Sequence, residues 1–218
     1  MNRRIIITDD GSSTLYVPGL DEHYHSVHGA MRESMHVFIG NGLNRVEKNP
    51  IAVLEVGFGT GLNACLTLEM LKRSSRGVYY ESWEKYPLTN AEYEELNYTS
   101  LDGVDESLYR SITGAPWNHE FRVYPDGILK KIEADFLNFT SPRYFDLVYF
   151  DAFGPDCQPD LWTAEVFNSI GIRQLPGSIL TTYSVKGLVR RNLAEAGYQV
   201  EKVPGPKGKR EITVAIKK

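Results

Sequence analysis

A glycine-rich turn behind an apolar run most constrains how this chain can fold. The stretch VLEVGFGTGLN, residues 53–63, places Gly57, Gly59 and Gly61 directly after a continuous apolar segment. The apolar segment predicts a buried strand, and the leucine spacing over 60–71 predicts an amphipathic helix. Glycines between a strand and a helix allow the backbone to approach a ligand closely, so the turn predicts a binding site. A tight turn without a ligand is the alternative.

The rest of the chain repeats this alternation of strand and helix. Apolar runs predict strands over 51–56, 78–83, 120–124, 128–134, 146–150, 178–183, 198–203 and 211–216, and helical spacing predicts helices over 29–39, 89–111, 161–172 and 187–196. Such alternation is typical of an α/β fold with a doubly wound, mostly parallel sheet of the Rossmann-like type. The last two strands have no helix between them and predict an antiparallel hairpin at the sheet edge. Residues 5–8 and 14–17 predict a short N-terminal hairpin.

Length and composition predict one globular domain. The chain has 218 residues without a repeat or a linker-like segment, so we expect a core over 50–218 and an N-terminal extension, 1–49, that covers the site. Its apolar runs are far shorter than the ~20 residues needed to span a membrane. Cys65 and Cys157 are the only cysteines, too few for a disulfide framework or a metal knuckle. We expect a monomer in the cytoplasm, without membrane association.

The glycine spacing and an acidic residue before it favour a ligand that carries a cation. The pattern G-x-G-x-G is one residue tighter than the dinucleotide fingerprint, and no Gly-Lys-Ser/Thr follows, which excludes a P-loop. Glu55 would repel a pyrophosphate. S-adenosylmethionine has a positive amino group and a sulfonium, and its carboxylate can accept hydrogen bonds from a helix N-terminus. We therefore predict S-adenosylmethionine as the cofactor. Its predicted contacts here are Glu55, Gly57, Phe58, Gly59, Thr60, Gly61 and Asn63.

Carboxylates after later strands extend the predicted cofactor site. Ribose hydroxyls are typically bound by a carboxylate at the end of the second strand, about 20 or more residues after the glycines. Glu84 is a better candidate than Glu81 because it follows the apolar end of that strand at Trp83. A solvated carboxylate is the alternative. Asp135 is placed to accept from the adenine amino group, or else to cap a helix.

The stretch DAFGP, residues 151–155, follows the strand at 146–150, where α/β enzymes place their chemistry. A carboxylate that faces a sulfonium methyl group suits an amine nucleophile, since an amine is protonated near neutrality. Asp151 is predicted to contact the cofactor and to accept this proton or orient the neutral amine. Phe153 is predicted to stack on a base or on the cofactor. The alternative is a cap at Asp151 and a core role for Phe153. The five histidines complete no recognisable zinc pattern, so we expect no metal site.

The charge of the chain is distributed unevenly. Residues 181–218 carry a net charge of +6 and the remainder −10. A basic end on an acidic body suits an enzyme that binds a polyanion at one edge, and a solvated terminus is the alternative. The candidates for phosphate contacts are Lys186, Arg190, Arg191, Lys207, Lys209 and Arg210. Arg210 is also a candidate for the site itself.

Five segments resemble, in this order, those of the MnmC-like methyltransferases. They read EHYHSVHGAMRESMHVFI, LEVGFGTGLN, EKYPL, DAFGPDCQPDLWTAEVFNSI and LVRRNLAEAGYQVEKVPGPKGKREI. The resemblance covers nearly the whole chain, from Tyr24 to Arg210. The DAFGP block and the closing G-K-R-E are more specific than the glycine motif. The resemblance implies methylation of 5-aminomethyl-(2-thio)uridine at wobble position 34 of transfer RNA, giving 5-methylaminomethyl-(2-thio)uridine. The partner would be a transfer-RNA anticodon loop.

The resemblance also implies roles for individual residues. Asp151 matches the family's active-site aspartate, and Lys209 with Arg210 matches its basic closing motif. Tyr24, Ser26 and Glu33 match an N-terminal motif expected near the cofactor or the substrate base. Candidates for stacking on the splayed base are Tyr24, Phe153 and Tyr183.

Other functions remain open at this point. The best-known family members carry a second, flavin-dependent oxidase domain that makes the amine, and this chain has no room for one. We therefore expect a separate oxidase or another pathway enzyme to supply the aminomethyl group. The alternatives are an aminopropyl transferase that acts on polyamines, a dinucleotide oxidoreductase and a non-catalytic RNA-binding module.

Overall fold

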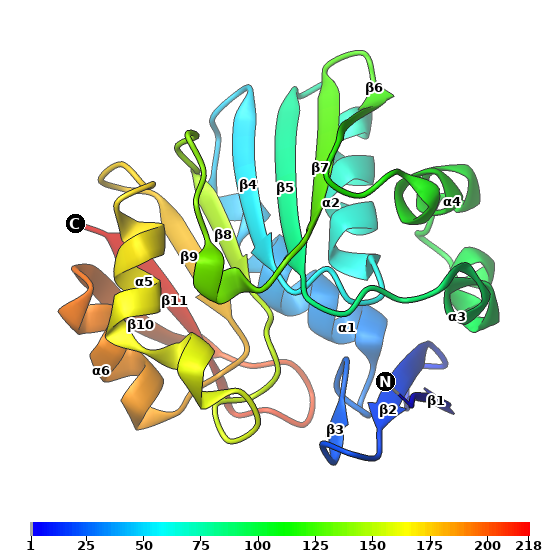
Figure 1. Ribbon diagram of the computed structural model, residues 1–218, viewed down its shortest axis with the longest axis horizontal. Coiled ribbons are helices and arrows are strands. Elements are labelled where there is room, and N and C mark those ends of the chain that lie inside the picture. Colours follow the sequence, from blue (N-terminus) through cyan, green and yellow to red (C-terminus); the bar gives the residue numbers. More distant parts are fainter. Residues whose placement is uncertain (1) are drawn as a thin grey trace.

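The computed structural model describes residues 2–218 and contains a central sheet of eight strands (Figure 1). These strands are β4 (Ile51–Val56), β5 (Val78–Glu84), β6 (Glu120–Tyr124), β7 (Gly127–Glu133), β8 (Leu147–Phe150), β9 (Ile179–Thr182), β10 (Tyr198–Pro204) and β11 (Glu211–Lys217). Their order across the sheet is β10-β11-β9-β8-β4-β5-β7-β6. The pairs among β4, β5, β7, β8 and β9 are parallel, whereas β6 and β11 run antiparallel to their inner neighbours. The predicted Rossmann-like sheet is confirmed, with the antiparallel hairpin β10–β11 at one edge.

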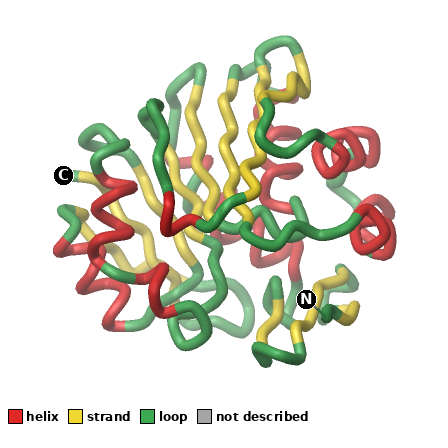
Figure 2. Tube along the Cα trace, viewed as in Figure 1, coloured by secondary structure: helices red, strands yellow, loops and turns green. Residues whose placement is uncertain are grey.

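Helices cover both faces of this sheet (Figures 1 and 2). The α-helices are α1 (Ala30–Ser34), α2 (Leu62–Arg73), α3 (Asn90–Glu95), α4 (Glu106–Gly114), α5 (Ala164–Gly171) and α6 (Gly187–Glu195). Shorter turns are η1 (Met35–Gly40), η2 (Leu43–Arg45), η3 (Asn97–Ser100), η4 (Phe136–Asn138) and η5 (Pro159–Trp162). Within residues 2–218, no helix combines the length and the apolar character that crossing a membrane requires.

The continuous apolar runs of the inner strands are explained by burial on both faces. Along β8, Leu147 and Tyr149 pack in the core beneath α2, whereas Val148 and Phe150 pack in the core beneath α5 and α6. Successive side chains of a strand point to opposite faces, so a strand covered on both sides needs apolar residues at every position. All four side chains are fully buried.

The N-terminal segment forms a separate small sheet beside the ends of the central strands (Figure 1). Its antiparallel strands are β1 (Arg4–Ile7), β2 (Ser13–Val17) and β3 (Glu22–His23). Arg3 attaches this segment to the core, because it donates to the Tyr24 hydroxyl at 2.9 Å and to the Glu92 carboxylate at 3.0 Å. The predicted hairpin therefore has a third strand and lies next to the predicted site.

The helix predicted over 29–39 changes its winding halfway. Residues 30–34 are α-helical, and η1 is a π-helix. The Thr181 hydroxyl of β9 donates to the Val37 carbonyl at 3.0 Å, and a side chain that bonds a helix carbonyl from outside perturbs the regular ladder. This contact joins two segments that are far apart in the sequence, so the local pattern could not show it.

Candidate active site

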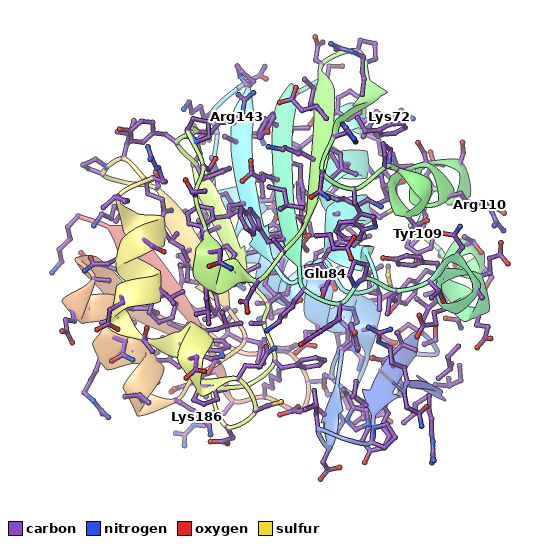
Figure 3. All side chains as sticks on the ribbon, viewed as in Figure 1. Lys72, Glu84, Tyr109, Arg110, Arg143 and Lys186 are labelled. Carbon is purple, nitrogen blue, oxygen red and sulfur yellow. The ribbon has the colours of Figure 1, made fainter. Side chains whose placement is uncertain are left out.

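A cavity of about 610 Å³ lies at the carboxyl ends of the parallel strands. It is bounded by the glycine turn after β4, the end of β5, the loop after β7, the DAFGP loop after β8 and the N-terminal segment around Tyr24. Its volume is within the range of small-molecule sites. The strand order reverses between β4 and β8, and α/β folds bind ligands at such switch points. Figure 3 shows Glu84 near the centre of the molecule, at the end of β5.

The glycine turn is packed too closely for larger residues. Gly57 has φ +93°, and a Cβ there would lie 2.7 Å from the backbone oxygen of Asp151. Gly59 has φ +50°, and a Cβ there would lie 3.0 Å from Cδ1 of Tyr24. Both positions therefore need the left-handed backbone conformation and the space that only glycine provides. The turn forms the floor of the cavity between β8 and Tyr24.

The turn leads into a helix that can receive an anion. Within residues 2–218, no side chain caps α2 at Gly61, which has φ +75°. The first amides of an uncapped helix carry partial positive charge and lack intrahelical partners. They fit the carboxylate of a cofactor of the predicted type. Gly61 itself does not line the cavity.

Glu84, and not Glu81, contributes its carboxylate to the cavity. Its two oxygens accept hydrogen bonds from the backbone of Gly59 at 3.0 Å and of Tyr86 at 2.8 Å. Each carboxylate oxygen can accept a second bond, so the group remains available to a hydroxyl-bearing ligand. Glu81 is 1% exposed and accepts from the Trp83 indole at 3.1 Å outside the cavity. Strand alternation places the two residues on opposite faces.

Asp135 lies where either of the two roles that the sequence left open is accessible to it. It lines the cavity, and it also caps η4 by accepting from the Leu137 amide at 3.0 Å. Lys85 donates to its other oxygen at 2.7 Å. This hydrogen bond holds the pKa of Asp135 below its usual range. The carboxylate is thus ionised and held at the rim.

Asp151 faces the cavity from the end of β8 with a perturbed proton affinity. Its Oδ2 accepts a hydrogen bond from the Asn63 side-chain amide at 2.8 Å. Burial of the carboxyl group raises the pKa of Asp151 well above its usual range, and the neighbouring carboxyl groups of Glu33 and Glu55 add to this shift. Lys209 opposes this shift in part. A carboxyl group with raised proton affinity inside a cleft is typical of a proton-transfer site.

Glu55 lies outside the cavity. Alternation along β4 places it on the same face as Val53, beneath α2, where it is fully buried. It accepts a hydrogen bond from the Ser82 hydroxyl at 2.6 Å, and burial raises the pKa of Glu55 to about 8. Glu55 therefore does not line the cavity in which the predicted ligand would bind. It influences the site only by raising the pKa of Asp151. The prediction overlooked that a residue two positions before the turn still lies within β4, with its side chain on the face that α2 covers.

The N-terminal motif of Tyr24, Ser26 and Glu33 lines the cavity opposite the glycine turn. The Tyr24 ring meets the Phe153 ring edge-on, with centroids 5.1 Å apart. The Ser26 backbone amide donates to Glu33 Oε2 at 2.8 Å. The segment thus brings one aromatic face and one carboxylate toward the DAFGP loop.

His25 is a lining residue that the sequence reasoning did not single out. Its Nε2 lies 2.8 Å from the Thr60 hydroxyl, and burial lowers the pKa of His25 to about 4. It is therefore a neutral link between the N-terminal segment and the glycine turn. Its position in the sequence resembles that of its neighbours His23 and His28, so no local signal distinguishes it.

Lys209, and not Arg210, enters the cavity from the β10–β11 loop. Its Nζ forms an ion pair with Glu33 Oε1 and lies 4.3 Å from the centroid of the Tyr183 ring. Arg210 is exposed and does not line the cavity. The structure therefore places the neighbouring Lys209 at the cavity and leaves Arg210 on the surface.

The other candidate phosphate contacts lie outside the cavity. Lys186 pairs with Asp156 of the DAFGP loop, and Arg190 Nη1 lies 3.8 Å from Glu211. Figure 3 shows Lys186 at the lower edge of the molecule, the side to which the strands direct their carboxyl ends. The exposed members of this set are Lys186, Arg191, Lys207 and Arg210. Within residues 2–218, no three His, Cys, Asp or Glu side chains form a group that could hold a metal ion.

Comparison with known proteins relates this chain to methyltransferases. Residues 121–218 match a family described as S-adenosyl-L-methionine-dependent methyltransferases. A tRNA 5-methylaminomethyl-2-thiouridine biosynthesis bifunctional protein, MnmC, from Cupriavidus metallidurans is 30% identical over 96% of this chain and 33% of its own length. The protein of the same name from Aromatoleum aromaticum is 32% identical over 96% of this chain and 34% of its own length. The chain thus spans about a third of the length of these relatives.

Solved structures agree with these alignments. The crystal structure of MnmC2 from Aquifex aeolicus has a TM-score of 0.80 at 28% identity, and the match covers 98% of this chain and 69% of that one. Spermidine synthase from Thermotoga maritima has a TM-score of 0.59 at 13% identity, and the match covers 99% of this chain and 68% of that one. This likeness shows the fold alone. The resemblance to MnmC-like methyltransferases is confirmed over nearly the whole chain.

Proposed function

We propose that this protein is an S-adenosylmethionine-dependent N-methyltransferase that acts on transfer RNA. It would convert 5-aminomethyl-(2-thio)uridine at wobble position 34 into 5-methylaminomethyl-(2-thio)uridine. The observation that carries the proposal is the placement of Asp151, with its raised proton affinity, directly beside a cofactor-type glycine turn. The MnmC relatives, whose name specifies this transfer-RNA modification, support the choice of substrate.

The residues of the cavity fit the proposed cofactor. Glu84 would hold the ribose hydroxyls, Asp135 the adenine amino group and the start of α2 the carboxylate. Gly57 and Gly59 have no side chains that could fill the floor of the cavity, and a Cβ at either position would crowd Asp151 or Tyr24. Bound S-adenosylmethionine would supply an electrophilic methyl group on sulfur.

Asp151 would perform the proton transfer that methylation of an amine requires. The substrate enters as a primary ammonium, and Asp151 accepts one of its protons. The nitrogen lone pair released in this way would then be available for the methyl group that bound S-adenosylmethionine would supply. The product is a secondary ammonium, and the proton stays on Asp151 until solvent removes it. Asn63 keeps the Asp151 carboxylate oriented during this step.

The surroundings of the cavity suit a base in a single-stranded loop. Such a base can be splayed into a pocket while phosphates are held outside it. Tyr24, Phe153 and Tyr183 offer aromatic rings at the cavity. Positive charge outside it comes from the exposed residues Lys186, Arg191, Lys207 and Arg210. Within the proposal, the protein acts as a monomeric single domain in the cytoplasm, residues 1–49 cover the site, and another enzyme makes the aminomethyl group.

A methyl-transfer assay tests the proposal. The purified protein is incubated with labelled S-adenosylmethionine and an anticodon stem-loop that carries 5-aminomethyl-2-thiouridine. We expect 5-methylaminomethyl-2-thiouridine in the nucleoside digest, and no label in a matched RNA with unmodified uridine. Putrescine with decarboxylated S-adenosylmethionine serves as the comparison for aminopropyl transfer. Product formation only in the polyamine reaction would refute the proposal.

A further inference from the structure

An ammonium group of the chain itself lies in the cavity that contains Asp151. Lys209 directs its Nζ to Glu33 Oε1, with which it forms an ion pair, and the same Nζ lies 4.3 Å from the centroid of the Tyr183 ring. Glu33 is 6% exposed. A buried carboxylate beside an aromatic face is complementary to a primary ammonium group.

Contacts other than those with Lys209 hold this subsite in shape. The Ser26 amide donates to the second oxygen of Glu33 at 2.8 Å. The Tyr183 hydroxyl donates to the Ala152 carbonyl at 2.8 Å, directly after Asp151 in the chain. The carboxylate and the ring are therefore positioned independently of the lysine. They also adjoin the residue to which we assign proton transfer.

Lys209 can leave this position without opening the core. Its side chain is 27% exposed, whereas that of Glu33 is 7% exposed. The loop that carries it also bears the exposed residues Lys207 and Arg210, which do not line the cavity. A lysine side chain carries a compact charge at the end of a flexible four-carbon chain, so rotation about its bonds can bring the ammonium to the surface.

We propose that Glu33 and Tyr183 form the subsite for the primary ammonium group of the substrate, and that Lys209 fills it until the substrate displaces it. The inference rests on the proposed function, because it takes an aminomethyl group as the substrate. One cation leaves as another enters, so the buried Glu33 carboxylate is never left unpaired, which would be costly.

The exchange explains why the substrate would have to be an RNA. The displaced Lys209 ammonium emerges beside Lys207 and Arg210, where we expect the phosphates of the anticodon loop. A phosphate there gives the displaced cation a new partner. A free nucleoside pairs its own ammonium with Glu33 but offers no such partner to the displaced Lys209.

The test measures binding of two nucleosides that carry no phosphate. Calorimetry with 5-aminomethyluridine and with the neutral 5-hydroxymethyluridine is done in the presence of S-adenosylhomocysteine, so that no methyl group is transferred. We expect Lys209→Met to tighten binding of 5-aminomethyluridine about tenfold, since a charged hydrogen bond no longer has to be broken. The affinity for 5-hydroxymethyluridine should change less than twofold.

A second variant removes the charge of the proposed subsite. Glu33→Gln should reduce the affinity for 5-aminomethyluridine to that for the neutral nucleoside. Lys202→Met, an exposed lysine of β10 outside the cavity, is the matched control and should behave as wild type.

A second measurement uses the wild-type protein and does not depend on the folding of a variant. In protein labelled with ¹⁵N-lysine, the Nζ signal of Lys209, assigned with Lys209→Arg, should shift when 5-aminomethyluridine is added and stay unchanged with 5-hydroxymethyluridine. An unmoved signal at saturation, or unchanged or weaker binding by Lys209→Met, would make the pair a structural tie only. Tighter binding of S-adenosylmethionine alone would assign the subsite to the amino group of the cofactor and overturn the inference.

These outcomes separate the subsite from the proposed activity. Nucleoside binding as expected without methyl transfer to RNA would leave the ammonium subsite standing and refute the transfer-RNA methyltransferase. Methyl transfer to RNA with no effect of Lys209→Met would refute the subsite alone.

Discussion

The side-chain amide of Asn63 donates a hydrogen bond of 2.8 Å to Oδ2 of Asp151. Asn63 belongs to the first turn of α2, and Asp151 follows β8, so the bond joins the two sides of the switch point in the sheet. One donor on one oxygen leaves the other oxygen of the carboxylate open to a substrate. The bond therefore decides in which direction Asp151 can accept a proton.

Removal of Asp151 should affect the reaction much more than cofactor binding. We expect Asp151→Ala to lose about 10² to 10⁴ of the single-turnover methylation rate, the usual share of a positioned general base. Its affinity for S-adenosylmethionine by calorimetry should stay within a few-fold. Asp151→Asn preserves the shape of the side chain, but its amide cannot accept the proton. Near-native turnover by the Asn variant would mean that Asp151 only orients the amine. A fully active Ala variant would contradict the assignment.

Loss of the Glu84 carboxylate should weaken cofactor binding about ten- to a hundredfold. Hydrogen bonds to a charged group contribute roughly 1.5–3 kcal/mol each, and Glu84 also holds the Gly59 amide. The variant is Glu84→Ala, and the readout is calorimetry with S-adenosylmethionine. Glu133→Ala is the matched control, because Glu133 pairs with Glu84 in register on β7 but is exposed outside the cavity. Equal affinities of the two variants would rule out the ribose contact.

A side chain at Gly59 should abolish cofactor binding beyond its effect on stability. Gly59→Val enforces a left-handed backbone on a branched residue and places Cβ 3.0 Å from Tyr24. Gly103→Val is the control, since Gly103 has φ +89° and a Cβ there would meet nothing within 4 Å. Both variants should lose about 1–2 kcal/mol of stability in urea. Only Gly59→Val should lose S-adenosylmethionine binding, and retained binding would remove the turn from the site.

Glu55 should make the protein less stable as the pH rises through the neutral range. Burial raises the pKa of Glu55 from 4.5 in the unfolded chain to about 8 in the folded one. Its contribution is thus complete below pH 4.5 and is lost up to about pH 8, at about 1.4 kcal/mol per pH unit. Glu55→Gln should remove this loss, so its stability relative to wild type should increase between pH 5 and pH 8 in urea titrations. A constant difference between the two proteins would show that Glu55 is ionised in the fold.

The exposed cations of the β10–β11 loop should determine how salt weakens RNA binding. Each lost phosphate contact should lower the slope of log affinity against log salt by roughly one unit. We expect Lys207→Ala/Arg210→Ala to show a slope lower by about two. Lys72→Ala/Arg73→Ala at the end of α2 is the control; Lys72 lies toward the upper edge in Figure 3, away from Lys186. Matching slopes for both double variants would make the loop charge a solvated surface only.

The parts of the site that lie within one strand–turn–helix unit could be predicted from the sequence. The glycine turn follows from the glycines placed directly after an apolar run. The choice of Glu84 over Glu81 follows from strand alternation, and both are local properties. The doubly wound sheet follows from the order of apolar runs. Glu55 was misplaced because the prediction considered its distance from the turn and not the face of β4 to which it belongs.

The remaining contacts could not be predicted because they join distant parts of the chain. Arg3 reaches Glu92, His25 reaches Thr60 and Lys209 reaches Glu33. No periodicity records which of several similar histidines or lysines turns inward, since that is decided by the packing of separate elements. The sequence pattern therefore predicts the floor of the cavity well and its cover poorly.

The ion pair between Glu33 and Lys209 also has a consequence for synthesis of the protein. The two residues are separated by 176 positions. At about 5–20 residues per second, a ribosome needs roughly ten to thirty seconds to extend the nascent chain from one to the other. During that interval Glu33 has no cationic partner from the β10–β11 loop, and its carboxylate is held by the Ser26 amide. The ion pair is thus completed only near the end of the translation of these 218 residues, and a nascent chain that has not reached Lys209 lacks the cation that pairs with Glu33 at the cavity.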